Sequence, residues 1–128
     1  MPLRIMVAER DPVLRELLYD ILNDEHYQVA AYGIGNAVIA TAEFWQPDLF
    51  IIDTRLPDIH GGVLCKNIKS HAQLSGTPVI LASIDACSGC STYQHRCDGF
   101  LRKPFDLMAF LNMVSDLTGR MNRINKAV

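Results

Sequence analysis

The sequence predicts an α/β protein in which five parallel strands alternate with five helices. Short apolar runs alternate with segments whose apolar residues recur every three or four positions, the spacings of buried strands and amphipathic helices. This alternation favours right-handed crossovers and a sheet covered on both faces. At 128 residues the chain has room for one domain. The usual solution at this size is a flavodoxin-like three-layer αβα sandwich with strand order 2-1-3-4-5.

Composition excludes several other classes of protein. Hydrophobic residues make up 49% of the chain and charged residues 20%, which excludes a disordered chain or a coiled coil. The formal net charge of −2 gives no electrostatic reason to expect binding to nucleic acid or a membrane surface. No apolar run reaches the roughly 18 residues of a membrane span, and the N-terminal run meets Glu9 too early for a signal peptide. We therefore expect a cytoplasmic protein.

The first part of the chain predicts two strands, each followed by a helix. Leu3–Ala8 is apolar on both faces, as in a buried parallel strand. Asp11 is an N-cap residue before a proline, so a helix should run from there to about Asn23. A weaker strand is expected over Tyr27–Tyr32 and a helix over Ala37–Trp45. The apolar stripe of the first helix consists of Leu14, Leu17, Leu18 and Ile21.

The middle of the chain contains the strongest strand signal. Leu49–Ile52 is wholly apolar and stops at Asp53. A loop with proline and two glycines follows, and the next helix is expected over Val63–Ser70. The fourth strand is expected over Val79–Ala82.

The last part predicts a helix, a strand and a final helix. Asp85–Arg96 has the poorest helical pattern because it contains Gly89 and few large apolar residues. Gly99–Leu101 is a short strand, and the last helix should start near Asp106. The expected buried face of that helix consists of Leu107, Phe110, Leu111, Val114 and Leu117.

Polar side chains follow the predicted strands at one edge of the sheet. Ligands of open α/β sheets bind at this edge, near the point between the first and third strands where the strand order reverses. The residues there are Glu9, Arg10 and Asp11 after the first strand, Asp53 after the third, Ser83 after the fourth and Lys103 after the fifth. Such a set suits phosphoryl chemistry, with Asp53 as the nucleophile and Lys103 and Ser83 holding phosphoryl oxygens.

Several motifs in order resemble one family. Residues from about 3 to 118 resemble a response-regulator receiver domain of two-component signalling. The matching motifs are Asp53 after an apolar strand, the loop Leu56–Gly61, the strand start Thr77–Ile80, Ser83, Phe100 and Lys103–Phe105. The resemblance implies that Asp53 is the phosphoacceptor, Lys103 the family's invariant lysine, and Ser83 and Phe100 the switch residues.

The sequence departs from the family pattern at the metal site. The family has two adjacent acidic residues after the first strand, and they help to bind Mg²⁺. Here Glu9 takes the first place and Arg10 the second, while Asp11 matches an acidic residue that often follows. A cation about 4 Å from a divalent ion costs roughly 8 kcal/mol at an effective dielectric of about 20, as an upper bound. We therefore expect no cofactor, with Mg²⁺ bound weakly at most, through Glu9 and Asp53 if at all.

Arg10 allows three alternatives. It could pair with Asp53 or Glu9 and hold the domain in one state without phosphorylation. It could instead clamp the phosphoryl group, or point into solvent. Two further departures lie near the switch: bulky Ile84 should narrow the entrance to the site, and Phe100 replaces the commoner tyrosine and has no hydroxyl.

Four cysteines remain, and in this setting they are more consistent with thiols than with disulfides. Cys87 and Cys90 have the two-residue spacing of redox and zinc motifs, but no second cysteine pair or spaced histidine pair accompanies them. Packing is the expected role of Cys65 and Cys97. A redox role for Cys87 and Cys90 is kept as an alternative.

Together these features predict an atypical receiver domain over residues 1–118 and a C-terminal helical extension or tail over 119–128. We expect a signalling module and no enzyme, acting with a histidine kinase or phosphotransfer protein, a downstream protein, or both. Output is expected through the face of the fourth helix, fifth strand and fifth helix, which could also form a homodimer. The alternatives are a conventional receiver phosphorylated at Asp53 and a thiol-responsive binding module.

Overall fold

The fold is built on a single parallel sheet. The computed structural model describes residues 2–84 and 97–119. Its five strands lie in the order β2-β1-β3-β4-β5, and every neighbouring pair is parallel. The strands are β1 (Arg4–Ala8), β2 (Gln28–Tyr32), β3 (Leu49–Asp53), β4 (Val79–Ser83) and β5 (Gly99–Arg102). The predicted strand order and direction are confirmed.

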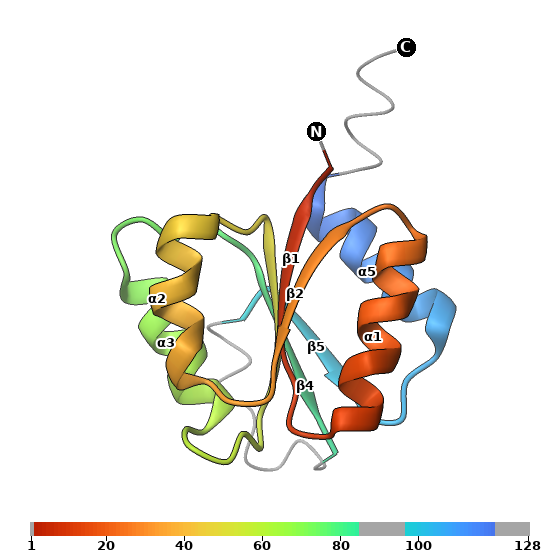
Figure 1. Cartoon of the computed structure of the whole chain (residues 1–128), viewed down its shortest axis with the longest axis horizontal. Helices are drawn as coiled ribbons and strands as arrows, with labels where there is room; N and C mark the ends of the chain where they lie inside the picture. Colours follow the sequence, from red (N-terminus) through yellow and green to blue (C-terminus); the bar gives the residue numbers. More distant parts are fainter. Residues whose placement is uncertain (1, 85–96, 120–128) are drawn as a thin grey trace.

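Helices cover both faces of this sheet. Within the described residues they are α1 (Pro12–Asp24), α2 (Asn36–Trp45), α3 (Gly61–Ser70) and α5 (Leu107–Thr118). In Figure 1, α1 and α5 lie on one side of the sheet and α2 and α3 on the other. The predicted fourth helix, Asp85–Arg96, lies outside the described residues, and so does the expected C-terminal extension beyond Gly119. None of the described helices is long and apolar enough to cross a bilayer.

Each face of the sheet has its own apolar cluster. Ile51 and Ile80 pack with Phe110 of α5 on one face. Phe50 and Leu81 pack with Ile68 of α3 on the other. The central strands alternate between these clusters because successive side chains point to opposite faces. Cys65 is buried in the second cluster, which confirms its predicted packing role.

The beginning of α3 was not predicted correctly. The helix begins at Gly61 rather than Val63, because the Nδ1 atom of His60 accepts a hydrogen bond from the N–H of Gly62 at 3.0 Å and caps the helix. A Cβ atom at Gly61 would lie 2.2 Å from the carbonyl oxygen of Asp53. Only glycine allows this approach, so α3 starts directly against the end of β3.

One predicted core position is wrong: Leu107 of α5 was expected on the buried face of its helix, yet it is 47% exposed. Leu17, in the apolar stripe of α1, is 52% exposed. Both line a surface groove of about 600 Å³ between α1 and the β5–α5 connection. The N-cap at Asp11 is confirmed, because its carboxylate accepts a hydrogen bond from the N–H of Val13 at 2.9 Å.

Candidate functional site

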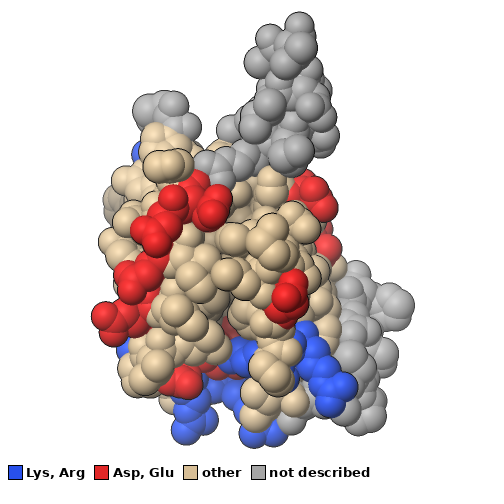
Figure 2. Space-filling model, turned by 90° about the vertical axis from the view of Figure 1, so that its right-hand side faces the viewer, with Lys and Arg blue, Asp and Glu red and all other residues tan. Residues whose placement is uncertain are grey.

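One pocket lies at the carboxyl ends of the central strands. It has a volume of about 480 Å³, and it is lined by Glu9, Arg10, Asp11, Pro12, Leu14, Asp53, Arg55, Ile84 and Lys103. The parallel sheet therefore brings together most of the residues that the sequence places at this edge. Figure 2 shows Lys and Arg side chains gathered at this end of the molecule, on the side of α1 and α5.

Asp53 is the last residue of β3, and its carboxylate lies at the floor of the pocket. The residue is only 6% exposed. Its Oδ1 atom accepts a hydrogen bond from the N–H of Arg55 at 3.0 Å, and its Oδ2 atom accepts one from the N–H of Arg10 at 3.2 Å. These two backbone N–H groups hold the carboxylate in one orientation and stabilise its ionised form.

Lys103 reaches the pocket from the end of β5. Its Nζ atom lies 2.5 Å from Glu9 Oε1 and 3.5 Å from Asp53 Oδ2. The predicted reach to Asp53 is present, but the closer partner is Glu9, which also accepts a hydrogen bond from the N–H of Asp11 at 3.0 Å. The lysine thus bridges two buried carboxylates.

The two carboxylates have opposite pKa shifts. Burial, and then the hydrogen bond shared with Asp53, raise the pKa of Glu9 although Lys103 opposes them. Burial alone would raise the pKa of Asp53, but the hydrogen bonds from Glu9 and from the N–H groups of Arg55 and Arg10, with the charge of Lys103, lower it. Because the pKa of Asp53 falls, this residue carries the negative charge that a nucleophile needs.

Of the three alternatives for the Arg10 side chain, the ion pair with Asp53 or Glu9 is not formed in the described part of the chain. Among the described residues the guanidinium of Arg10 has no salt bridge with Glu9 or Asp53, and only its backbone N–H contacts Asp53. Lys103 already forms an ion pair with Glu9, and Arg10 is an exposed residue at the rim of the pocket. The carboxylate of Asp11 is likewise engaged as the cap of α1.

The predicted switch residues lie away from the pocket lining. Ser83 ends β4 and is 1% exposed, and its hydroxyl accepts a hydrogen bond from Thr54 Oγ1 at 2.9 Å. Phe100 is half-buried and packs against the apolar cluster on the α2 and α3 side. Ile84 lines the pocket and is 55% exposed, which agrees with its expected place at the entrance.

The cysteine predictions are resolved only in part. Cys87 and Cys90 lie outside the described residues, so their redox role stays a prediction. Cys97 is half-buried beside the second apolar cluster, and burial raises the pKa of its thiol. A raised pKa disfavours the reactive thiolate, which is consistent with packing.

Three residues at this edge were not identified from the sequence. Thr54 contacts Ser83, Arg55 lines the pocket, and Asp58 accepts hydrogen bonds from the N–H groups of Gly35 and Asn36 at 2.8 Å each. Strand alternation could have placed Thr54 on the face opposite to Asp53. Nothing in the sequence pattern links Asp58 to the start of α2.

Comparison with known proteins identifies the family of this chain. Residues 5–115 match the sequence profile of the response regulator receiver domain. The chain belongs to the response-regulator receiver family. It is therefore a receiver domain of two-component signalling, as its motifs predicted.

Curated relatives of this receiver domain are longer regulators. The chain is 29% identical over 104 residues to the DNA-binding response regulator MtrA of Mycolicibacterium smegmatis, covering 80% of the chain and 44% of MtrA. It is 29% identical over 129 residues to RpaA of Synechocystis, a DNA-binding dual master transcriptional regulator, covering 97% of the chain and 52% of RpaA. The chain spans about half the length of the curated relatives that it matches.

Solved structures agree with the receiver fold. A receiver domain of a signal transduction histidine kinase from Syntrophus aciditrophicus superposes with a TM-score of 0.85 at 27% identity, covering 94% of this chain and 92% of that one. A receiver domain protein from Methanospirillum hungatei has a TM-score of 0.85 at 22% identity, covering 96% and 98%. A receiver domain of a sensor histidine kinase from Pseudomonas aeruginosa, with magnesium in its active-site cleft, has a TM-score of 0.85 at 21% identity, covering 93% and 99%.

Proposed function

We propose that this receiver accepts a phosphoryl group on Asp53 from a phosphohistidine of a histidine kinase or phosphotransfer protein. The observation that carries this proposal is the state of the Asp53 carboxylate. It is buried and has a lowered pKa, and it lies at the floor of an open pocket with Lys103 Nζ 3.5 Å away. This combination supplies a fixed, charged nucleophile beside a cation.

The proposed transfer needs only the phosphohistidine donor and one proton from water. An Asp53 carboxylate oxygen attacks phosphorus, and a P–O bond forms while the P–N bond of phosphohistidine breaks. The electron pair of the broken bond stays on the imidazole nitrogen, which takes a proton from water. Lys103 is placed to neutralise charge on the phosphoryl oxygens once they arrive.

We further propose that Mg²⁺ binds weakly at this site, because the residues present do not fit the ion. Glu9 is held by Lys103, and Asp11 is held as the cap of α1. The pocket lining contains three acidic and three basic residues, so it offers little net negative charge. In the part of the chain that the structure describes, no group of three or more His, Cys, Asp or Glu residues is arranged to hold a metal. Mg²⁺ prefers oxygen ligands in near-octahedral geometry, which this arrangement does not supply.

Labelling by a phosphohistidine donor tests the phosphoacceptor. We expect the wild type to be labelled, with little dependence on Mg²⁺, and Asp53→Asn to lose the label. Asp116→Asn changes an exposed carboxylate on α5 outside the pocket and should be labelled like the wild type. Undiminished labelling of Asp53→Asn would refute the role of Asp53. Labelling of the wild type that requires sub-millimolar Mg²⁺ would instead favour a conventional receiver.

Titration with Mg²⁺ followed by calorimetry tests the role of Arg10. We expect Arg10→Asp to bind the ion at least about tenfold more tightly than the wild type, which is roughly 1.4 kcal/mol. Lys66→Asp makes the same change of charge on an exposed part of α3, away from the pocket, and should leave the affinity unchanged. Equal affinities for the wild type and Arg10→Asp would mean that Arg10 does not control the metal site.

The output of the domain is proposed to be protein contact at the face of β5 and α5, with a downstream protein or a second copy of the chain. The first turn of α5 supports this proposal, because Leu107 is 47% and Met108 61% exposed there. Exposed apolar side chains of this size favour contact with another protein surface.

A further inference from the structure

Two buried hydroxyl groups meet where β3 and β4 end. Thr54 is 3% and Ser83 1% exposed, and Thr54 Oγ1 donates a hydrogen bond to Ser83 Oγ at 2.9 Å. The N–H of Thr54 also donates to the carbonyl oxygen of Ala82 at 3.0 Å, which extends the β3–β4 pairing by one residue. The two hydroxyl groups are thus held in register by the sheet itself.

The hydroxyl pair faces away from Asp53. Asp53 and Ala82 are partners in the β3–β4 ladder, so the next residues, Thr54 and Ser83, point to the opposite face of the sheet. That face contains Ile52 and Leu81, beneath α2 and α3. In this arrangement the Ser83 hydroxyl is directed to Thr54 and does not line the pocket that holds Asp53.

A contact between Ser83 and a phosphoryl group on Asp53 would therefore have a definite cost. The Ser83 side chain would have to turn out of the α3 side and break its hydrogen bond with Thr54. The Thr54 hydroxyl would lose that bond in a buried position, and a buried polar group without a partner destabilises the state in which it occurs.

We propose that Thr54 is a positioning residue that holds the Ser83 hydroxyl away from Asp53 in the unphosphorylated domain. Its hydrogen bond then opposes the rearrangement of Ser83 and sets how readily the domain responds to a phosphoryl group. The proposal rests on the proposed function of Asp53.

The test compares Thr54→Val with Thr54→Ser. Valine has nearly the shape of threonine but no hydroxyl, whereas serine keeps the hydroxyl. We expect Thr54→Val to bind beryllofluoride, a mimic of the phosphoryl group, about three- to tenfold more tightly than the wild type in excess Mg²⁺, while its folding stability falls. Thr54→Ser should restore the wild-type affinity. A residue with a merely structural role would lower the stability and leave the affinity unchanged or weaker.

A double-mutant cycle is completed by making Thr54→Val in a Ser83→Ala background. There the affinity gain from Thr54→Val should disappear, since no hydroxyl remains to be released. A gain that persists in Ser83→Ala, or an unchanged affinity in Thr54→Val, would overturn the proposal.

A second readout separates this proposal from the function of Asp53. NMR scalar couplings report the side-chain rotamer of Ser83 in the free domain, and we expect Thr54→Val to shift its population. If no variant binds beryllofluoride and the phosphohistidine donor does not label Asp53, the proposed phosphoacceptor fails. The rotamer then decides the positioning role: a shift supports it, and an unchanged Ser83 rotamer overturns it.

Discussion

Lys103 lies beside both carboxylates in the pocket. Its Nζ atom is 2.5 Å from Glu9 and 3.5 Å from Asp53, and the side chains of these two residues are only 3% and 7% exposed. The lysine lowers the pKa of both groups, and for Glu9 burial outweighs it. Removing the cation would leave two buried acids facing each other.

We expect Lys103→Met to raise the pKa of both Glu9 and Asp53, as measured by carbon NMR of their carboxyl groups. A carboxyl whose pKa is raised by folding stabilises the fold at low pH, and this contribution is lost as the pH rises through the folded value. The variant should therefore be less stable than the wild type by about 3 kcal/mol at neutral pH, with a smaller deficit in acid.

Lys66→Met is the control for this titration, because Lys66 is an exposed lysine on α3. Lys66→Met should leave the pKa of Glu9 and of Asp53 unchanged. Unshifted titrations in Lys103→Met would show that another group sets the charge of the pocket.

The sequence alone predicted which residues meet in this pocket better than it predicted which of them form ion pairs. Strand ends in a parallel sheet share one edge, so Glu9, Asp53 and Lys103 could be expected together. Which carboxylate is closer to Lys103 is decided by distances of 2.5 Å and 3.5 Å, and a difference of this size cannot be read from a residue pattern. Arg10 remained open for the same reason.

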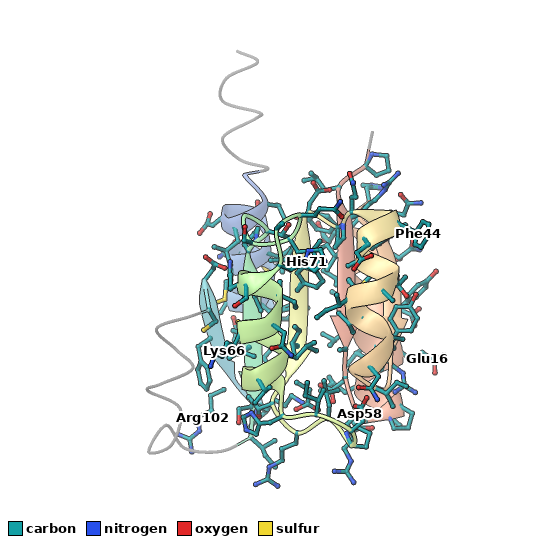
Figure 3. All side chains as sticks on the ribbon, turned by 90° about the vertical axis from the view of Figure 1, so that its left-hand side faces the viewer. Glu16, Phe44, Asp58, Lys66, His71 and Arg102 are labelled. Atoms are coloured by element: carbon teal, nitrogen blue, oxygen red, sulfur yellow. The ribbon has the colours of Figure 1, made fainter. Side chains whose placement is uncertain are left out.

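At the scale of elements, Asp58 ties the loop after β3 to the start of α2. Its two carboxylate oxygens accept hydrogen bonds from the N–H groups of Gly35 and Asn36, where the helix has no side-chain cap of its own. Figure 3 shows Asp58 at the end of the molecule where α2 begins. These bonds, led by the one from Gly35, lower the pKa of Asp58.

We expect Asp58→Asn to lower the melting temperature at neutral pH, because an amide oxygen can replace only one of the two acceptors. Since folding lowers the pKa of Asp58, its contribution is present above the ordinary value of 3.8 and is lost as the pH falls through the folded value. The difference between variant and wild type should therefore shrink in acid. A difference independent of pH would contradict the carboxylate role, and Asp116→Asn provides the control.

At the N-terminal cap of α3, a substitution is expected to raise the stability of the domain. His60 accepts the Gly62 N–H through a ring nitrogen, whereas a carboxylate in this place would also interact favourably with the helix dipole. We expect His60→Asp to raise the free energy of unfolding in urea by about 0.5–1 kcal/mol. His60→Ala should lower the free energy of unfolding. A loss of stability in both variants would mean that the imidazole ring stabilises the domain more than a carboxylate cap does.

Elements with a strong apolar pattern were predicted almost to the residue. Leu49–Ile52 is such a case, and the structure adds only Asp53 to the strand. The start of α3 was missed because two glycines disfavour a helix locally, and tertiary contact with β3 overrides that preference. The exposure of Leu107 was missed because periodicity shows which face of a helix a residue occupies, whereas Leu107 is the first residue of α5 and lies beside an open groove.

At the scale of the whole molecule, stability depends on two apolar clusters separated by the sheet. Phe110 of α5 is fully buried in one of them. Phe44 of α2 is 90% exposed and points away from the body of the domain in Figure 3. The same residue type thus occupies two extremes of burial on two helices.

We expect Phe110→Ala to lower the free energy of unfolding by about 3–5 kcal/mol. Phe44→Ala should change it by less than about 0.5 kcal/mol. Urea unfolding measured on both variants checks this difference. Similar losses in the two variants would show that α2 and α5 are not packed as the structure has them.

The parallel sheet also fixes where the ends of the described chain lie relative to the pocket. β1 starts, and α5 finishes, at the end of the molecule opposite to the carboxyl ends of the strands (Figure 1). A fluorescent label or a biosensor anchor attached at either end would therefore leave the pocket facing solution. Such an attachment would report a change at Asp53 only if the change were transmitted through the sheet and helices between them.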